Sequence, residues 1–382
     1  MADIPRLRRL LLALLRPDPA DPGLEGLNHE EWQMLDAMAA EHRLQPLLFA
    51  EWSGPARNGV VPDAILIGWS QAYRAAAIAA LAQKGALIGA VRMLEKSGLR
   101  PIALKGAWLA WHAHPAPALR PMRDIDLLVE THQAEAAWRL LHDAGHAAPF
   151  GTPDKAAATR DKHLPPLIGP SGVVIEIHGA CWETADQAGH AMPLARDSAM
   201  RAHAQMADGV LYPAPEDMLA HLVVHAVYSH WLDAGPLVLA DIDALVRKAP
   251  PDWPQFWADA EAEGWQKGAA LLLGLTDRWR RPGLLEQCGC PESVPPTLLE
   301  AAPDLMLQAM EKRAGARILA RLGREGVMAT GRAKLAEAAS NPHRAASLAG
   351  RRVRDLLSGL CHAGARRKSA DMRDLGRWLL PG

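Results

Sequence analysis

The chain has 382 residues, more than one average domain, so a catalytic module accompanied by further modules is expected. With 49% hydrophobic and 22% charged residues it has the composition of a folded globular protein, which excludes the disordered class. The net charge of -1 excludes a strong overall field for nucleic acid or anionic membranes. Four cysteines do not form a disulfide framework, so we expect a cytoplasmic protein.

The first segment, residues 1–97, is predicted to be an N-terminal helical module. Apolar residues recur there at helical spacing, for example Ile78, Leu81, Leu87 and Val91, and Gly98 is expected to end the last helix. The apolar run at 7–15 is too short to cross a membrane, and the Ala-rich stretch at 75–94 is interrupted by charged residues. We therefore expect no membrane partner.

Residues 98–213 change periodicity and predict a small mixed α/β unit. The predicted elements, in chain order, are a strand at 100–104, a helix at 105–114, a Pro-rich loop at 114–121, a strand at 124–129, a helix at 132–144 and a hairpin with strands at 163–168 and 173–177. The segment at 169–172 supplies the hairpin turn. The fold class is therefore α/β (α+β), with a small mixed sheet between helical modules.

Helices are predicted again after this unit. The domain 214–310 is expected to complete the cleft with helices at 215–230, 236–248, 254–263 and 265–279. The last segment, 311–382, is a basic helical tail with 16 Lys and Arg against 6 Asp and Glu. This tail either binds RNA or another anionic partner, or presents solvated helix faces.

Three carboxylates are expected to converge on the sheet. Alternate residues of a strand share a face, so Asp124 and Asp126 project together, and Glu176 alternates with isoleucines in the same way. Neighbouring carboxylates repel one another unless a cation offsets them, which points to a divalent metal such as Mg²⁺. Neutralising Asp126 is accordingly expected to abolish turnover and to leave thermal stability equal or higher.

Several motifs in order resemble a known superfamily. They are Leu104-Lys105-Gly106, the run from Arg120 through Asp124-Ile125-Asp126 to Val129, and Ile175-Glu176-Ile177-His178. Together they are similar to the DNA polymerase beta-like nucleotidyltransferases, and within them to the bacterial group of uncharacterised nucleotidyltransferases. The resemblance covers roughly residues 95–250.

The resemblance implies a mechanism and a set of site residues. It implies that Asp124, Asp126 and Glu176 bind two Mg²⁺ ions, with Mn²⁺ as an alternative, and orient a nucleoside triphosphate, ATP by default, for attack at its α-phosphorus. Glu176 would also help to activate the acceptor hydroxyl. The superfamily has Gly-Ser at the start of the preceding helix, whereas this chain has Lys105-Gly106, a helix start where phosphate is expected to bind.

Other polar residues carry open alternatives. Arg120 and Arg123 either stabilise the acidic strand as ion partners or bind triphosphate oxygens, and Asp241 either reaches the nucleotide or bonds to a neighbouring helix. Four histidines, at 163, 178, 221 and 225, are interpreted as partly buried residues rather than metal ligands, because no zinc motif accompanies them.

The predicted reaction moves a nucleoside monophosphate from the triphosphate to a hydroxyl acceptor and releases pyrophosphate. The acceptor is a small molecule, a peptide, a protein or RNA, and modification of a peptide natural product is one role that the resemblance allows. The alternatives are a toxin-like or regulatory enzyme acting on tRNA or a protein, and a scaffold that only binds nucleotide.

Overall fold

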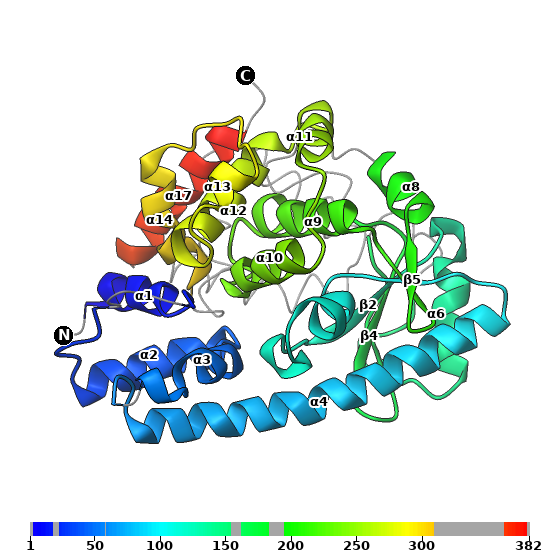
Figure 1. Cartoon of the computed structure of the whole chain (residues 1–382). Helices are drawn as coiled ribbons and strands as arrows, with labels where there is room; N and C mark the ends of the chain where they lie inside the picture. The colour runs from blue at the N-terminus through cyan, green and yellow to red at the C-terminus, as the bar shows by residue number, and fades with distance from the viewer. Residues whose placement is uncertain are drawn as a thin grey trace.

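The computed structural model describes residues 3–17, 23–57, 59–153, 162–182, 195–308 and 363–379. Within them, a six-stranded mixed sheet stands at one end of the molecule and helices form the rest (Figure 1). The fold is therefore mixed α/β, as the sequence predicts. Most of the predicted basic tail lies outside the described residues.

The sheet has the strand order β3-β4-β2-β1-β6-β5. Its strands are β1 (Ile102–Ala103), β2 (Asp124–Leu128), β3 (Leu167–Ile168), β4 (Val174–His178), β5 (Gln205–Ala207) and β6 (Val210–Tyr212). The neighbours β2 and β4 are parallel, and β2 is antiparallel to β1. This arrangement places the two acidic strands side by side in the interior of the sheet.

The alternation in β2 and β4 sorts their side chains into two faces. Ile125, Leu127, Ile175 and Ile177 are buried in the core, so the intervening acidic residues point the other way. The predicted hairpin is confirmed, since β3 pairs antiparallel with β4 and the amide of Gly169 donates to the carbonyl of Val173 at 2.8 Å. The β5–β6 hairpin has strands of only three residues each and has no counterpart in the sequence prediction.

Short helical elements surround the sheet. They are α5 (Gly106–Trp108), the π-helical turn η2 (Leu109–Ala113), the 3-10 turns η3 (Pro117–Leu119) and η4 (Thr131–Gln133), α6 (Ala134–Asp143) and α8 (Ala195–Ala202). The predicted helix at 105–114 is thus one turn of α-helix followed by a π-helical turn. Gly145, at φ 99°, ends the α6 segment as expected.

The N-terminal helices are α1 (Ile4–Ala13), α2 (His29–Glu41), α3 (Gln45–Trp52) and α4 (Asp63–Lys96), with a 3-10 turn, η1 (Pro55–Arg57), before α4. Asn28 and Glu31 form a capping box that starts α2. Gly98, at φ 79°, ends α4, and the amide of Leu99 donates back to the carbonyl of Leu94 at 3.1 Å. The predicted stop is confirmed.

Helix α4 runs along one edge of the molecule from the N-terminal helices to the sheet (Figure 1). It packs against α3, η3 and α6. Its 34 residues are long and apolar enough to cross a membrane by length and composition alone, with 33% of the most apolar window buried inside the protein. Its buried residues, including Trp69, Leu87 and Val91, belong to the hydrophobic cores, and the expectation of no membrane partner stays a prediction.

The C-terminal helices are α9 (Pro215–Val223), the π-helical turn η5 (Val224–Ser229), α10 (Leu237–Lys248), α11 (Trp253–Ala262), α12 (Gln266–Trp279), α13 (Leu284–Gln287), α14 (Pro296–Met306) and α17 (Ala363–Leu379). One buried cluster joins them to the N-terminal helices, including Trp52, Leu271 and Leu375. The two helical parts therefore share a core, and the end of the basic tail is folded into it through α17.

Candidate active site

The three predicted carboxylates lie on two neighbouring inner strands of the sheet. Asp126 on β2 is directly opposite Glu176 on the parallel strand β4, and Asp124 is two residues earlier on β2. All three line one pocket of about 450 Å³. The register follows from the apolar residues between them, because a one-residue slip would turn the carboxylates into the core.

Asp126 is the most strongly bonded of the three. Its Oδ2 lies 3.0 Å from the Lys105 ammonium, and its Oδ1 accepts from Nε2 of His178 at 2.9 Å. Burial opposes its ionisation, but Lys105 and His178 outweigh burial and hold the pKa of Asp126 well below its ordinary value. Burial lowers the pKa of His178 in turn, and the adjacent Asp126 raises it overall.

The pKa of Asp124 shifts in the opposite direction to that of Asp126. Burial and then the charges of Asp126 and Glu176 raise the pKa of Asp124. Glu176 resembles Asp126, since bonding to His178 and the nearby His163 overcome its burial and lower its pKa. Carboxylate repulsion is therefore concentrated on Asp124, whereas Lys105 and His178 compensate Asp126. This arrangement argues against the expectation that neutralising Asp126 leaves thermal stability equal or higher, and that expectation stays a prediction.

The acidic cluster has the donor set of a cation site. One ligand atom from each of Asp126, Glu176 and His178 can be chosen so that all lie within 4.8 Å of one another. Two carboxylates and an imidazole suit a divalent cation, and Asp124 adds a further oxygen to the same pocket. His178 was interpreted from the sequence as a partly buried histidine, whereas the structure places it among these potential ligands.

Lys105 and Gly106 form the turn between β1 and α5. Lys105 has φ 44° and ψ −112°, outside the usual regions for a residue with a side chain, and this turns its ammonium toward Asp126. A Cβ on Gly106 would meet Cγ of Met122 at 2.8 Å and Nη1 of Arg120 at 2.9 Å. Glycine is required here because Arg120 occupies the space beside the turn.

A wall of cations faces the carboxylates. Arg43, Lys105, Arg120, Arg123 and Lys162 line the pocket together with four histidines, at 163, 178, 225 and 230. Arg43 and Lys162 were not predicted. Arg43 precedes the sheet by more than fifty residues and enters through the N-terminal helices, so no local pattern identifies it. Burial, with Arg120 and Arg123, lowers the pKa of Arg43 to about 10.

Asp241 does not line this pocket. Its carboxylate is 1% exposed, accepts from Nε2 of His114 at 2.9 Å, and forms an ion pair with Nη2 of Arg120 at 3.1 Å. These bonds to His114 and Arg120 agree with the alternative in which Asp241 bonds to neighbouring structure, and its contact with a nucleotide stays a prediction. Arg120 in turn reaches both Asp241 and the pocket of the carboxylates.

The comparisons with known proteins give one match. A family model described as "Uncharacterised nucleotidyltransferase" matches residues 28–281 of the 382. This region contains the sheet, the carboxylates, the cation wall and Asp241. No curated protein and no solved structure matches the chain.

Proposed function

Since the chain belongs to this family of uncharacterised nucleotidyltransferases, an enzyme class that transfers a nucleotide with release of pyrophosphate, we propose that the cleft between β2, β4 and the cation wall moves a nucleoside monophosphate onto a hydroxyl acceptor. One observation carries the proposal: Asp124, Asp126 and Glu176 share a pocket with five Lys and Arg side chains. The same arrangement supports placing residues 98–213 with the cores of the DNA polymerase beta-like superfamily.

The donor is a nucleoside triphosphate, and we propose ATP. A triphosphate bound with a divalent metal presents both negative oxygens and a cation, which matches a pocket lined by both carboxylates and cations. Lys105 and Arg120 would bind phosphate oxygens, with Arg43 and Arg123 adding charge to the same wall. Gly106 keeps the space beside Arg120 open.

The acidic residues are proposed to hold Mg²⁺, or Mn²⁺ where His178 participates. The metal, when bound, would orient the triphosphate and stabilise the charge that develops at the α-phosphorus. Asp124 and Asp126 would be ligands, and Glu176 would also accept the proton of the attacking hydroxyl. Lys105 lies 3.0 Å from Oδ2 of Asp126, so a cation held by Asp126 would compete with this pair and would leave the ammonium available to the phosphates.

Cytoplasmic location is proposed together with this function. Cys181, Cys288 and Cys290 are free thiols, as expected for a reducing compartment.

The proposed nucleotidyl transfer is tested with each triphosphate in two labelled forms. The purified protein is incubated with Mg²⁺, host extract and a triphosphate labelled either at the α- or at the γ-phosphorus. Nucleotidyl transfer places the α-label, and not the γ-label, on an acceptor and releases pyrophosphate in equal amount. Transfer of the γ-label alone would identify a kinase and overturn the proposal. Mass spectrometry of the labelled product identifies the acceptor.

A further inference from the structure

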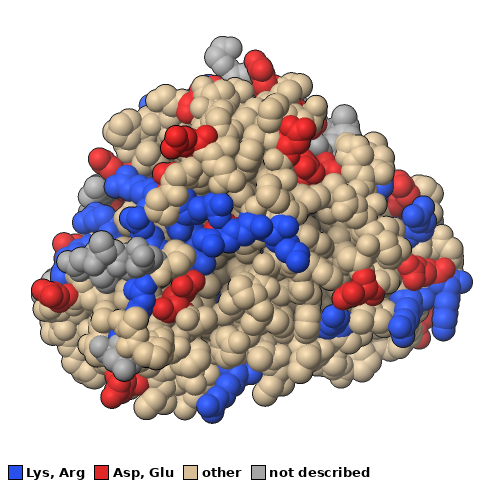
Figure 2. All heavy atoms as spheres, in the orientation of Figure 1, with Lys and Arg blue, Asp and Glu red and all other residues tan. Residues whose placement is uncertain are grey.

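A second basic pocket lies outside the cleft. It has a volume of about 450 Å³ and is lined by Arg16, Pro17, Arg247, Arg280, Arg281, Pro282, Gly283 and Gln287. None of these residues lines the cleft. Figure 2 shows that Lys and Arg side chains gather in a band across this face of the molecule. We call this site the arginine pocket.

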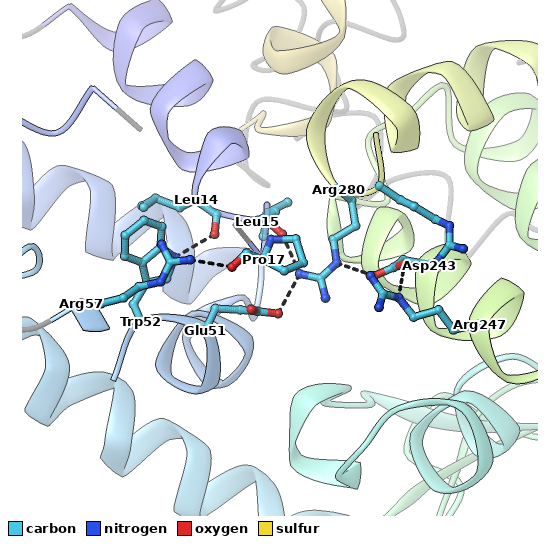
Figure 3. Close-up of polar contacts among 10 residues, drawn as sticks. Leu14, Leu15, Pro17, Glu51, Trp52, Arg57, Asp243, Arg247 and Arg280 are labelled. Carbon is cyan, nitrogen blue, oxygen red and sulfur yellow. Dashed lines mark hydrogen bonds and ion pairs between the residues drawn. The ribbon is translucent and has the colours of Figure 1, made fainter. Parts of the chain in front are cut away.

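One buried carboxylate organises the arginine pocket. Asp243 on α10 is 2% exposed and accepts from Nε of Arg247 at 2.6 Å, from Nε of Arg280 at 2.8 Å and from Nη1 of Arg281 at 3.2 Å (Figure 3). Burial opposes its ionisation, but Arg247 and Arg280 lower its pKa overall. The three guanidinium groups are thus oriented before any ligand arrives.

Arg280 also fixes the opposite wall of the arginine pocket. Its Nη1 donates to the carbonyl of Leu15 at 2.6 Å and to Oε1 of Glu51 at 2.9 Å (Figure 3). Arg57 donates to the carbonyl of Pro17 at 2.5 Å beside it. Segments from α1, α3 and α10 are therefore joined through Arg280, and its role is structural as well as electrostatic.

The remaining arginines are available to a ligand. The Arg247 side chain is 57% exposed although its Nε is bonded. Nε of Arg16 is buried without a hydrogen-bond partner among the described residues. Four guanidinium groups thus share two carboxylates, Asp243 and Glu51, in the part of the pocket that the structure describes. Among the described residues, the guanidinium groups of the pocket therefore outnumber the carboxylates bonded to them.

We propose that the arginine pocket is a second anion site, which binds a compact ligand carrying several phosphate groups, such as pyrophosphate or tripolyphosphate. Planar guanidinium groups pair with two phosphate oxygens at once, and the volume is that of a small-molecule site. Carboxylates that could ligate a cation converge in the cleft, whereas in the described part of the arginine pocket Asp243 is already bonded to three arginines. Binding here is therefore independent of metal.

Isothermal titration with tripolyphosphate in EDTA tests the site. The double variant Arg247→Ala/Arg281→Ala is expected to weaken binding at least ~10-fold, because each lost charged hydrogen bond removes a substantial part of the affinity. Arg139→Ala is the matched control, since Arg139 also bonds a carboxylate four residues away, Glu135, and is 62% exposed. This control should bind as the parent does.

Two further measurements keep the test decisive. Arg16→Ala breaks no bond to Asp243, so it should weaken binding even if the double variant fails to fold. Unchanged binding in both variants, or a loss that appears only in Arg123→Ala of the cleft, would overturn the proposal. A single-stranded RNA is titrated in parallel to test whether the surface binds RNA instead. If the arginine variants lose affinity for RNA and keep affinity for tripolyphosphate, the surface is an RNA contact and the small-ligand assignment is wrong.

Discussion

Helix α10 carries two buried aspartates two residues apart, and each holds the arginines of a different pocket. Asp241 anchors Arg120 in the cleft, whereas Asp243 anchors Arg247, Arg280 and Arg281 in the arginine pocket. In the cleft, cations also pair with carboxylates that can ligate a metal, as Lys105 does with Asp126. Under the proposed function, the Lys105–Asp126 pair would exchange when a metal binds, whereas the pairs of Asp241 and Asp243 with arginines form fixed frames.

The largest expected effect concerns the two aspartates of β2. Asp124→Asn and Asp126→Asn should each lower kcat by roughly 10³-fold or more, because each removes a proposed metal ligand. Without metal, the two substitutions should change the stability of the protein in opposite directions. The pKa of Asp126 is lowered on folding, so its ionised form stabilises the protein at neutral pH, and this contribution is lost as the pH falls through the folded pKa. The pKa of Asp124 is raised, so its ionised form destabilises.

Thermal unfolding in EDTA at neutral pH measures this difference. Asp124→Asn should raise the midpoint and Asp126→Asn should lower it, since the latter leaves Lys105 and His178 without their anion. In acid, below the folded pKa of Asp124, the stabilising effect of Asp124→Asn should disappear. Equal shifts in both variants would contradict the assignment of repulsion to Asp124.

The second prediction distinguishes the roles of the two aspartates of α10. Asp241→Asn should reduce kcat/KM for the triphosphate by roughly 10²-fold, because Arg120 loses the charge that positions it beside the phosphates. Asp243→Asn should instead lower the free energy of unfolding by about 3 kcal/mol, since three guanidinium groups lose their buried partner. Chemical denaturation measures the free energy of unfolding of both variants, and steady-state kinetics measures their kcat/KM. A dominant loss of kcat/KM in Asp243→Asn would show that the pockets are not separate.

The third effect concerns the exchangeable pair of the cleft. Lys105→Met keeps the length of the side chain and removes its charge, so KM for the triphosphate should rise ~10-fold through the lost phosphate contact. The unfolding midpoint in EDTA should fall, because Asp126 loses its neighbouring cation. If KM stays that of the parent, Lys105 is only an ion partner of Asp126.

The sequence predicted the acidic half of the cleft because that half is local. Asp124, Asp126 and Glu176 alternate with apolar residues, and strand alternation together with the fixed register of β2 and β4 brings them to one face. Gly98 and Gly145 were predicted to end helices, and both have positive φ values. The alternation and the helix ends depend on neighbours within a few positions, whereas the pairing of Asp126 with Glu176 joins distant parts of the chain and was expected from the order of the motifs.

Lys105, Arg120 and Arg123 of the cation wall were named from the sequence, but Arg43 and Lys162 were not, because no local pattern links them to the acidic strands. The bond between Asp241 and Arg120 spans 121 residues and likewise has no local signal. The β5–β6 hairpin is too short to show periodicity, and the π-helical turns at Leu109–Ala113 and Val224–Ser229 have the same local pattern as α-helix. Arg43 was missed entirely because its side chain reaches the cleft only through the packing of the N-terminal helices.

Substitution of Arg43 has the smallest expected effect, and it tests whether the packing of the N-terminal helices contributes to the cleft. It has φ 60° and its Nη1 donates to the carbonyl of Pro121 at 2.7 Å, on the loop before β2. Asn tolerates this backbone conformation, so Arg43→Asn removes the charge without adding strain. Even with its pKa lowered to about 10, Arg43 is charged at neutral pH, and its loss should raise KM for the triphosphate ~5-fold with little change in kcat. Arg139→Asn is the control outside the cleft, and equal KM values in the two variants would exclude the N-terminal helices from triphosphate binding.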